Sequence, residues 1–425
     1  MMIFILFATF AAFLVVGLPL AFAMGLSAIA AISLGSGQSL FIVPQRIYAS
    51  LDSFALLAVP LFILAGELMN SGGITERIVR FSRSAMGHFK GGLAQANILS
   101  NMFMAALSGS SLADLSAIGS MMIPAMVREG YKKAFAVAVT SCAALMAPII
   151  PPSVIAVIYG SITGISIGSL FLAGAIPGIM AGIGIMILSR VMAGKSGAKA
   201  MPRESWSQFG KAGLSAMPAM AVPVIIVGGI LSGIFTPTEA GAVAVAYALV
   251  FGIVTRRHNA GGVYSLLISA GVTTSSALLT LAGASLFSYV LVASGFAQAT
   301  LDLLVAATDN PSMALLLIFF VLLVLGMFVE TVSALILVTP ILIPIVAHYG
   351  FNDIQFGIFT LMTLVLGGLT PPVGILAMVA CRIAGIEYGK TFGMLTPFIL
   401  WWAAATLLVG YVPFLTTWLP SMVLN

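Results

Sequence analysis

The sequence predicts an all-α, polytopic membrane protein built as an inverted repeat, and three observations lead to this prediction. Of the 425 residues, 61% are hydrophobic and 7% are charged, whereas soluble domains carry about 25% charged residues. Apolar runs long enough to cross a hydrocarbon core of about 30 Å, which takes about 20 helical residues, recur along the chain. Prolines and glycines of the first half also recur at a fixed spacing in the second.

The first apolar run, residues 2–34, is expected to be a retained membrane helix. It is too long for the core of a signal peptide, no Lys or Arg precedes it, and it continues through Pro19. Cys142 and Cys381 both lie in apolar runs, so we expect buried thiols rather than a disulfide or a metal site. The net charge of +5 arises mainly in short loops, which makes it a topology signal and not a nucleic-acid surface.

A repeat joins two segments of the chain that lie 220 residues apart. The matching residues are Pro124, Gly130, Thr140, Pro151, Pro152 and Pro177 with Pro344, Gly350, Thr360, Pro371, Pro372 and Pro397, a spacing of 220 in every pair. A weaker pairing joins 17–20 with 235–238 at a slightly different spacing. Two related halves in a membrane protein are typical of secondary transporters.

The distribution of basic residues predicts that the two copies have opposite orientations. Loops 76–90, 128–133, 190–211 and 256–258 are rich in Lys and Arg and are expected to be cytoplasmic. The repeat partners of the first two, loops near 296–311 and 348–353, contain no Lys or Arg and are expected to be periplasmic, as is the C-terminus. The uncharged turn 161–169 corresponds to 381–390, which carries Arg382 and Lys390. The bias therefore reverses in all three comparisons, as an inverted repeat requires.

Each copy contains a predicted re-entrant hairpin. The first lies between Lys90 and Arg128, with its tip at 108–111, and both of its ends are expected to be cytoplasmic. The second runs from about 312 to 347, with its tip at 326–333. Irregular backbone at membrane depth is tolerated only where it is buried in protein or lines a wet cavity, so the two tips are expected to face a binding site.

A double proline follows each hairpin, at Pro151-Pro152 and at Pro371-Pro372, and it interrupts an apolar stretch. Proline has no amide hydrogen and clashes with the preceding turn, so each helix is expected to break. A break leaves carbonyl oxygens without donors, and such oxygens are ligands for a hard cation such as sodium. A simple proline kink without an ion is the alternative, but a hairpin followed by a break, repeated twice, favours an ion site.

Four acidic residues lie within apolar sequence, where charge is costly and usually functional: Glu67, Asp114, Glu239 and Glu330. Asp114 and Glu330, close to the two tips, either ligate a cation or hold a tip by accepting hydrogen bonds from backbone amides, and the second role is favoured for Asp114. Glu239 follows Thr236 in a pattern typical of a helix cap and is expected to be structural.

Four half-helices are expected to begin after Ser111, Pro152, Thr331 and Pro372. Their positive dipole ends would point toward the centre of the membrane, which suits an anionic group such as a carboxylate. No intramembrane arginine is obvious as a direct clamp for that anion.

Several motifs together resemble the large membrane subunit of TRAP transporters, the DctM type. These are Ser108-Gly109-Ser110-Ser111, Ala113-Asp114, Ala147-Pro148-Ile149-Ile150-Pro151-Pro152-Ser153, Phe235-Thr236-Pro237-Thr238-Glu239-Ala240 and Gly368-Leu369-Thr370-Pro371-Pro372-Val373-Gly374. The resemblance implies sodium-coupled uptake of a small organic anion, such as a C4-dicarboxylate or sialic acid, across a bacterial or archaeal inner membrane. It also implies a periplasmic substrate-binding protein, a small four-helix membrane subunit of the DctQ type, an elevator mechanism, and no cofactor besides sodium as the coupling ion.

The resemblance also assigns residues to sites. One sodium site would be formed by Ser108, Gly109, Ser110, Ser111, Ala147 and Ile150, and the other by Gly326, Val329, Glu330, Thr331, Gly367 and Thr370. Residues expected to bind substrate or to stabilise a tip are Ser111, Asp114, Pro152, Ser153 and Pro372. Because the second tip lacks a serine-rich turn, the side-chain ligands of its site are left open.

The same resemblance divides the chain into a scaffold and a transport domain. The scaffold would comprise 1–91, 168–311 with the repeat linker 190–211, and the C-terminal helix 388–425. The transport domain would comprise 92–167 and 312–387. Three alternatives remain: a stand-alone sodium:carboxylate symporter, a membrane-embedded enzyme and a channel. The enzyme is disfavoured because His88, His258 and His348 lie far apart in the sequence, and the channel because opposed hairpins fit alternating access better.

Overall fold

The computed structural model describes residues 1–35, 37, 39–195 and 203–423, and within them the secondary structure is entirely helical. The α-helices are α1 Met2–Val15, α2 Leu20–Gly35, α3 Ile42–Leu51, α4 Ala58–Ser71, α5 Ile74–Met86, α6 Gly92–Ser108, α7 Ser111–Arg128, α8 Lys133–Ala144, α9 Val154–Thr163, α10 Ile167–Met192, α11 Trp206–Leu231, α12 Pro237–Val254, α13 Ala260–Ala293, α14 Phe296–Ala307, α15 Pro311–Phe328, α16 Thr331–Tyr349, α17 Asp353–Gly367, α18 Ile375–Ala384, α19 Phe392–Tyr411 and α20 Phe414–Val423. Short 3₁₀ helices, η1 Phe54–Leu57, η2 Ala193–Lys195 and η3 Tyr388–Thr391, join some of them.

Eight helical segments in the described part of the chain are long and apolar enough to cross a membrane. They are Phe54–Ser71, Ile167–Met192, Trp206–Leu231, Pro237–Val254, Ala260–Ala293, Pro311–Phe328, Thr331–Tyr349 and Tyr388–Tyr411. The prediction of a multi-pass, all-α membrane protein is therefore confirmed.

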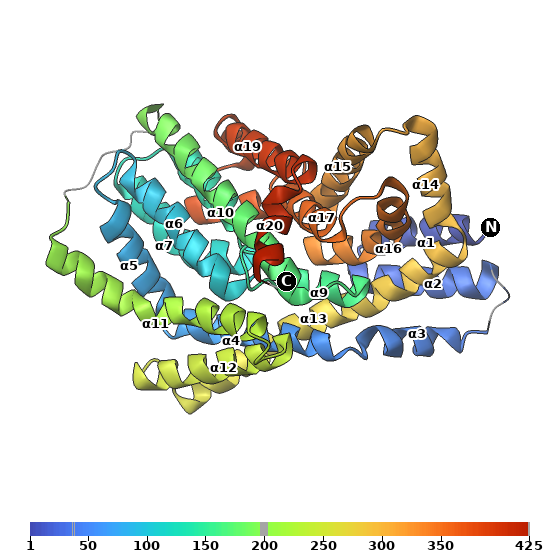
Figure 1. Ribbon diagram of the computed structural model, residues 1–425, viewed down its shortest axis with the longest axis horizontal. Coiled ribbons are helices and arrows are strands. Elements are labelled where there is room, and N and C mark those ends of the chain that lie inside the picture. Colours follow the sequence, from blue (N-terminus) through green and yellow to red (C-terminus); the bar gives the residue numbers. More distant parts are fainter. Residues whose placement is uncertain (36, 38, 196–202, 424–425) are drawn as a thin grey trace.

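The two copies of the repeat have the same order of elements. Hairpin 1 is α6–α7 and hairpin 2 is α15–α16, and each precedes a broken helix, α8 with α9 in the first copy and α17 with α18 in the second. The two double prolines, Pro151-Pro152 and Pro371-Pro372, lie in the breaks, and both peptide bonds are cis. Figure 1 shows the two hairpins on opposite sides of the centre, which is the arrangement of an inverted repeat.

Two further corresponding pairs pack at the ends of the molecule. Helices α1 and α2 lie together against α13, and α11 and α12 lie beside α4 and α5, toward the opposite end (Figure 1). Glycines allow the closest contacts in this part of the fold: a Cβ at Gly283 of α13 would lie 2.3 Å from the Ala21 carbonyl oxygen, and one at Gly241 of α12 would lie 2.9 Å from Leu61 Cβ. Small residues at such positions let membrane helices approach closely.

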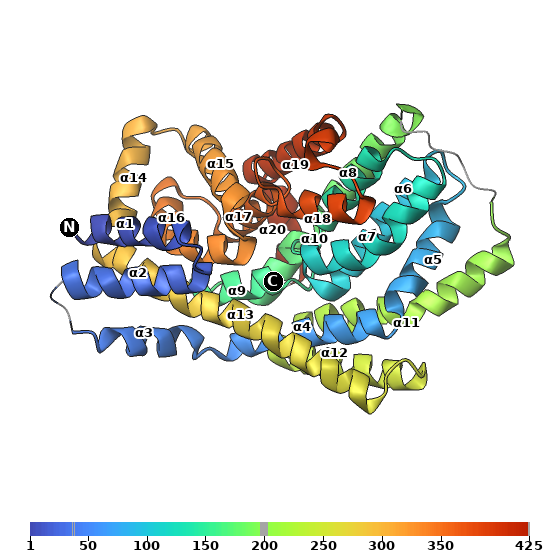
Figure 2. The same cartoon turned by 180° about the vertical axis from the view of Figure 1, so that it is seen from behind.

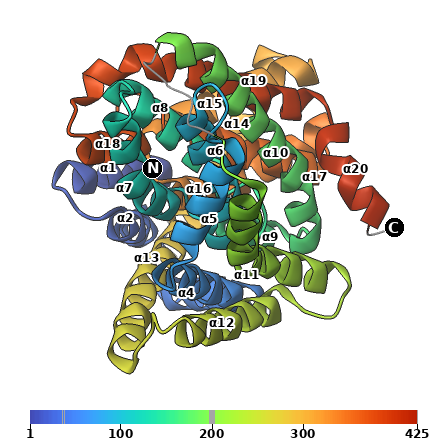
Figure 3. The ribbon, with the colours of Figure 1, turned by 90° about the vertical axis from the view of Figure 1, so that its left-hand side faces the viewer.

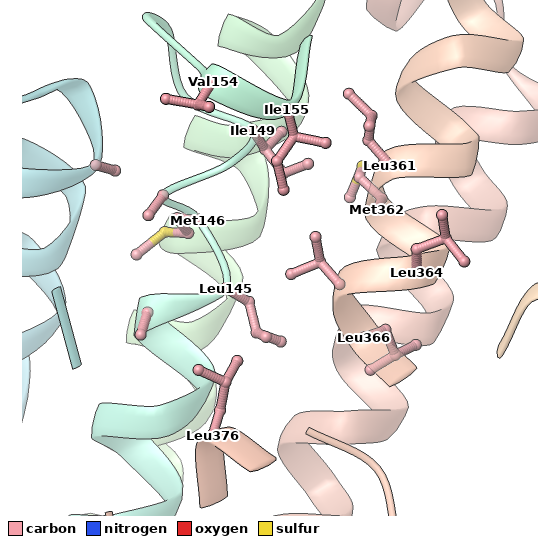
Figure 4. Close-up of a cluster of buried hydrophobic side chains, with 14 of the residues drawn as sticks. Leu145, Met146, Ile149, Val154, Ile155, Leu361, Met362, Leu364, Leu366 and Leu376 are labelled. Atoms are coloured by element: carbon pink, nitrogen blue, oxygen red, sulfur yellow. The ribbon is translucent and has the colours of Figure 1, made fainter. Parts of the chain in front are cut away.

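The helices form two layers when the molecule is viewed along its long axis. Figure 3 shows α4, α12 and α13 together on one side and α8, α10 and α19 on the other. Helices α10 and α19 contact the broken helices, and α18 packs against α7 (Figure 2). The centre of the second layer is apolar, because Leu145, Ile149 and Ile155 of the first broken helix point toward Leu361 and Leu364 of α17 (Figure 4).

Two details of the predicted organisation are wrong. The run 2–34 is not one helix, because the chain turns at 16–19, where Gly17 has a φ of +86° and Pro19 precedes α2. The segments 76–90 and 296–311 are not simply loops, because each holds a helix, α5 and α14 respectively. Arg77, Arg80 and Arg83 therefore lie on α5, whose buried residues, such as Ile78, occupy the other positions of an amphipathic pattern. In the linker 190–211, residues 196–202 lie outside the described residues.

The scaffold elements of the two copies are not identical. Helix α13 is continuous over 34 residues, whereas the corresponding part of the first copy is divided into α3, η1 and α4. The interruption falls at Asp52 and Ser53, whose backbone leaves the helical conformation. Helices α3 and α4 both lie against α13.

Candidate functional site

Hairpin 1 turns at Gly109 and Ser110, as predicted. Gly109 ends α6 with a φ of +61°, a conformation that favours glycine. The Ser110 side chain caps α7 by accepting a hydrogen bond of 3.4 Å from the amide of Ala113. The Ser108 hydroxyl donates to the carboxylate of Asp114 and accepts a 3.3 Å hydrogen bond from the Ser110 amide. The two arms of the hairpin are thus joined directly at the tip.

Asp114 is buried, with 1% of its surface exposed. Its expected partners were backbone amides, but the structure gives Asp114 Oδ1 the hydroxyl of Ser108 instead. Among the described residues, Asp114 Oδ2 and the hydroxyl of Ser111 are buried without a hydrogen-bond partner. Two oxygen atoms close to the tip of hairpin 1 therefore remain available to a ligand.

The first break follows directly from the double proline. In a continuous helix, the amides of residues 151 and 152 would serve the carbonyls of Ala147 and Pro148, and proline supplies neither amide. The Ser153 hydroxyl donates to the Pro148 carbonyl at 2.6 Å and accepts from the Ala156 amide at 3.1 Å, so it also caps α9. Within the described ranges, no group donates a hydrogen bond to the Ala147 carbonyl. The predicted free carbonyl of the first break is therefore present at Ala147.

The tip of hairpin 1 contacts the end of this break. A Cβ placed on Gly109 would lie 3.1 Å from both the Pro152 carbonyl oxygen and the Val154 amide nitrogen. On the scaffold side, a Cβ on Gly66 of α4 would lie 3.4 Å from Ser108 Cα. Hairpin 1 is thus held between the first break and α4.

Sequence reasoning missed the helix that covers the first break. A Cβ on Gly174 of α10 would lie 2.3 Å from the Ile149 carbonyl oxygen, and one on Gly178 would lie 2.5 Å from Ile150 Cγ1. These two glycines form a G-x-x-x-G pattern, which continues to Gly182 and is a known signal of close helix packing in membranes. Ala147 and Ile150 are buried as a result.

Hairpin 2 turns at Val329 and Glu330, inside the predicted tip. The Glu330 carboxylate caps α16 by accepting hydrogen bonds from the Ser333 amide at 3.1 Å and the Ser333 hydroxyl at 3.3 Å. The role of holding a tip through a backbone amide therefore belongs to Glu330, while Asp114 uses a hydroxyl. Glu330 is exposed, and Thr331, the first residue of α16, is half-buried.

The second break differs from the first in its hydrogen bonds. The Gly367 carbonyl accepts from the Thr370 amide at 3.0 Å, and the Gly368 carbonyl accepts from the Leu376 amide at 3.1 Å. The Thr370 hydroxyl donates to the Leu366 carbonyl at 2.8 Å. The carbonyls that proline leaves without partners in this copy are thus partly served by neighbouring amides. A carbonyl oxygen has a second lone pair, so these atoms can still accept a ligand.

Hairpin 2 contacts the second break through two glycines. A Cβ on Gly367 would lie 2.3 Å from the carbonyl carbon of Gly326, and a Cβ on Gly326 would lie 2.6 Å from the Leu364 carbonyl oxygen. The structure therefore brings Gly326 and Gly367, two of the predicted site residues, into direct backbone contact.

The two copies also differ in exposure and in where their half-helices begin. Residues 145–153 of the first break are all buried, whereas Pro372 in the second is exposed. Helices α9 and α18 begin at Val154 and Ile375, slightly later than predicted, and α18 has no side-chain cap because Gly374 precedes it.

The other acidic residues in apolar sequence have structural partners. Glu239 Oε2 accepts hydrogen bonds from the Thr236 amide at 2.7 Å and from its hydroxyl at 2.8 Å, which confirms the predicted cap. Glu67 Oε1 accepts from the Ser269 hydroxyl at 3.1 Å and so links α4 to α13. Both cysteines are buried and free, as predicted.

A family model describes nearly the whole chain. Residues 7–415 match the model of the tripartite ATP-independent periplasmic transporter, DctM component. The fold alone is similar to that of the YdaH transporter of Alcanivorax borkumensis, with a TM-score of 0.65 and 14% sequence identity over 98% of this chain and 99% of that one.

Three relatives match over most of this chain. The sialic acid TRAP transporter large permease protein SiaM of Vibrio cholerae is 36% identical over 96% of both chains. The isethionate TRAP transporter permease protein DctMQ of Oleidesulfovibrio alaskensis is 38% identical over 96% of this chain and 65% of its own length. The C4-dicarboxylate TRAP transporter large permease protein DctM of Pseudomonas aeruginosa is 35% identical over 94% of this chain and 93% of its own. The chain therefore belongs to the DctM family, the large permease components of TRAP transporters, and it is a transporter subunit rather than an enzyme.

Proposed function

We propose that this chain carries a small organic anion into the cytoplasm of a bacterial or archaeal cell, driven by sodium that enters with it. A periplasmic substrate-binding protein would deliver the anion, and a small four-helix membrane subunit would enlarge the scaffold. The chain would lie in the inner membrane, with the basic segments 76–90, 128–133, 190–211 and 256–258 on the cytoplasmic side.

The observation that carries the proposal is the pairing of each hairpin with a break in the same copy. Gly109 contacts the first break, and the Ala147 carbonyl in that break has no donor among the described residues. Gly326 contacts Gly367 in the second. Hard cations such as sodium are held by carbonyl and hydroxyl oxygens, and irregular backbone inside membrane transporters supplies such atoms.

The two sodium sites would use the residues predicted from the resemblance. In the first copy, the Ala147 carbonyl lies in a buried break. In hairpin 1, close to its tip, Ser111 and Asp114 each keep an oxygen atom without a hydrogen-bond partner. In the second copy, the Gly367 carbonyl would offer its second lone pair, and Thr370 would offer its carbonyl oxygen. The more exposed second site would exchange its ion more readily than the first.

The two-layer arrangement supports an elevator mechanism. The hairpins and broken helices would move as a transport domain along the layer of α4, α12 and α13. The segments 92–167 and 312–387, predicted from the sequence, form the core of this proposed transport domain. Because α10 and α19 pack on the broken helices, we propose that these two helices move with them, although the sequence assigned both to the scaffold.

The substrate class follows from the relatives. Sialic acid, isethionate and C4-dicarboxylates, named for three of them, are all small organic acids with a carboxylate or a sulfonate. We propose the same class here. The helix N-termini of α7, α9, α16 and α18 would favour the charge of such a group.

The test is uptake into liposomes that contain this chain and its small subunit. Labelled succinate, isethionate and sialic acid are supplied in turn, each bound to its periplasmic binding protein, with and without an inward sodium gradient. The expected result is accumulation of one acid that requires both the gradient and one binding protein. A matched reconstitution without the small subunit serves as the control for assembly.

Other outcomes select the alternatives. Sodium-driven uptake of the free acid, without a binding protein, would establish a stand-alone symporter. Uptake that is indifferent to sodium would overturn the two ion sites, and flux that dissipates a gradient in either direction without accumulation would establish a channel.

A further inference from the structure

A cavity of about 430 Å³ lies between the two layers, and no predicted tip or break residue lines it. Its walls come from α3, η1 and α13 on one side and from α9 and α16 on the other. Sites for small molecules typically measure about 300–1,000 Å³. The polar residues of the lining are Arg46, Ser50, Ser53, Ser161, Ser285, Ser288 and Tyr289.

Among the described residues that line the cavity, Arg46 alone carries a positive charge. Its guanidinium lies 4.5 Å from the centre of the Tyr289 ring. The ion pairs among the described residues join Arg257 to Glu76 and Lys390 to Glu387, so no acidic side chain pairs with Arg46. Arg46 is exposed on α3, which packs against the candidate membrane span α13. An arginine at membrane depth is costly unless it has an anionic partner or reaches water, and it usually marks a functional site.

The same wall also supplies hydroxyl groups. Ser285 and Ser288 lie three residues apart on α13, on the same side of that helix. Serine hydroxyls donate hydrogen bonds to oxyanions, and arginine binds them with two parallel donors. The guanidinium fork matches a carboxylate, and its charge attracts a sulfonate equally.

The position of the cavity relates it to transport. Ser161 lies in the last turns of α9, at the start of the segment 161–169, and Val292 and Ala293 lie next to the 296–311 segment. The basic-residue pattern predicts both segments to be periplasmic. If α9 and α16 move against α3 and α13, as in the proposed elevator mechanism, the cavity keeps its shape in only one position of the transport domain.

We propose that this cavity is the site where the organic acid first binds after it leaves the periplasmic side, and that Arg46 pairs with its carboxylate or sulfonate. The inference rests on the proposed function for its substrate class and its direction. Arg46 is then a specificity-determining residue, because an uncharged analogue gains nothing from the guanidinium. It would act before the acid reaches the hairpin tips.

A purely structural role for Arg46 makes a different prediction. Arginine can lay its aliphatic stem along apolar surface and stack on an aromatic ring, which fixes α3 to α13 without any substrate. In that case the substitution Arg46→Gln would change stability and leave the affinity for acids unchanged.

The test is direct binding of labelled succinate, isethionate and sialic acid to the purified chain with its small subunit, at saturating sodium. Arg46→Gln is expected to raise the dissociation constant of the bound acid about tenfold, which corresponds to a loss of about 1.4 kcal/mol in binding free energy. Arg46→Lys should lose less than this, because the charge remains while the fork is lost. The matched control is Arg77→Gln, since Arg77 also stacks on a ring, 4.9 Å from the centre of Phe251, but does not line the cavity.

Each outcome decides the inference. Weaker binding in Arg46→Gln with normal binding in Arg77→Gln supports it, provided that both variants elute as the same complex as the parent. Equal affinity of Arg46→Gln and the parent overturns it, and so does a parent that binds none of the three acids. A parent that binds an acid through Arg46 but shows no sodium-driven uptake would overturn the proposed function and leave the binding site in place.

Discussion

The contact between hairpin 2 and the second break gives the sharpest prediction, through the substitution Gly367→Ala. The new Cβ would lie 2.3, 2.5 and 2.8 Å from the carbonyl carbon, the Cα and the carbonyl oxygen of Gly326. All three atoms belong to the backbone, so no side chain can rotate away. The two segments would have to separate until these contacts exceed 3.0 Å, below which real Cβ atoms essentially do not pack.

Two effects of this substitution oppose each other. Alanine is favoured over glycine inside a helix by about 1 kcal/mol, and Gly367 is the last residue of α17. Forcing an extra methyl group into a closed contact costs about 1–3 kcal/mol, and more where only backbone can yield. We expect the clash to dominate, so any equilibrium that needs the tip seated on the break should shift by about 5- to 150-fold.

The assay is the sodium concentration for half-maximal uptake, measured in liposomes together with the melting temperature of the purified complex. Gly367→Ala should raise the sodium half-saturation by at least about fivefold and lower the melting temperature. Gly393→Ala is the matched control, because it makes the same helical exchange on α19 where no atom lies within 4 Å of the new Cβ. If Gly367→Ala matches the parent in both measurements, the close approach of the two backbones does not exist.

Three other substitutions follow from the hydrogen bonds of the site. Ser153→Ala removes the buried bond to the Pro148 carbonyl and the cap of α9, so it should destabilise the protein by about 1–3 kcal/mol, read as a lower denaturation midpoint. Asp114→Asn keeps an acceptor for the Ser108 hydroxyl but removes the charge, and we expect the folded complex with a raised sodium half-saturation. Glu330→Gln keeps the cap on α16, so it should fold normally, and its sodium half-saturation reports whether the carboxylate is a ligand.

Each of these has its own control. Ser153→Thr retains the hydroxyl and should recover most of the stability, and a midpoint as low as that of Ser153→Ala would place the effect elsewhere. For Asp114, the variant Ser108→Ala separates the two roles: if it disturbs sodium dependence as much as Asp114→Asn, the pair acts by positioning the tip. An unchanged half-saturation in Glu330→Gln would remove this carboxylate from the second ion site.

The architecture was readable from the sequence wherever backbone chemistry dictates it. Pro151 and Pro152 cannot donate the amides that a helix needs, so the break and its free carbonyl at Ala147 follow from residue type alone. The hairpin turns were predictable because Gly109 supplies a left-handed conformation beside residues that cap helices. The opposite orientation of the two copies was predicted from the distribution of Lys and Arg among the loops. This distribution reflects which side of the membrane each loop occupies and does not depend on local packing.

Features that depend on packing were not predictable in the same way. Gly174 covers the first break, while the corresponding position in the second copy is Met394, so the repeat pattern alone could not foretell that one break is closed and the other partly open. The amide partners of Gly367 and Gly368 arise from the fold of the loop after the prolines. The proposed role of Arg46 was not predictable from the sequence because it depends on the surrounding helices, and only the tertiary structure brings α13 and α16 to this residue.

The unequal scaffold elements have a consequence for local opening. Along α13 the amide hydrogen bonds form one uninterrupted ladder over 34 residues, so opening any part of it should break bonds on both sides. In the neighbouring part of the scaffold, α3 ends before Asp52 and α4 begins only after η1. The backbone amides of this short interval can therefore exchange with solvent without breaking a continuous helix. The continuous helix α13 should therefore resist bending, while α3, η1 and α4 beside it can bend relative to one another. Bending of the scaffold should be confined to the interruption between α3 and α4.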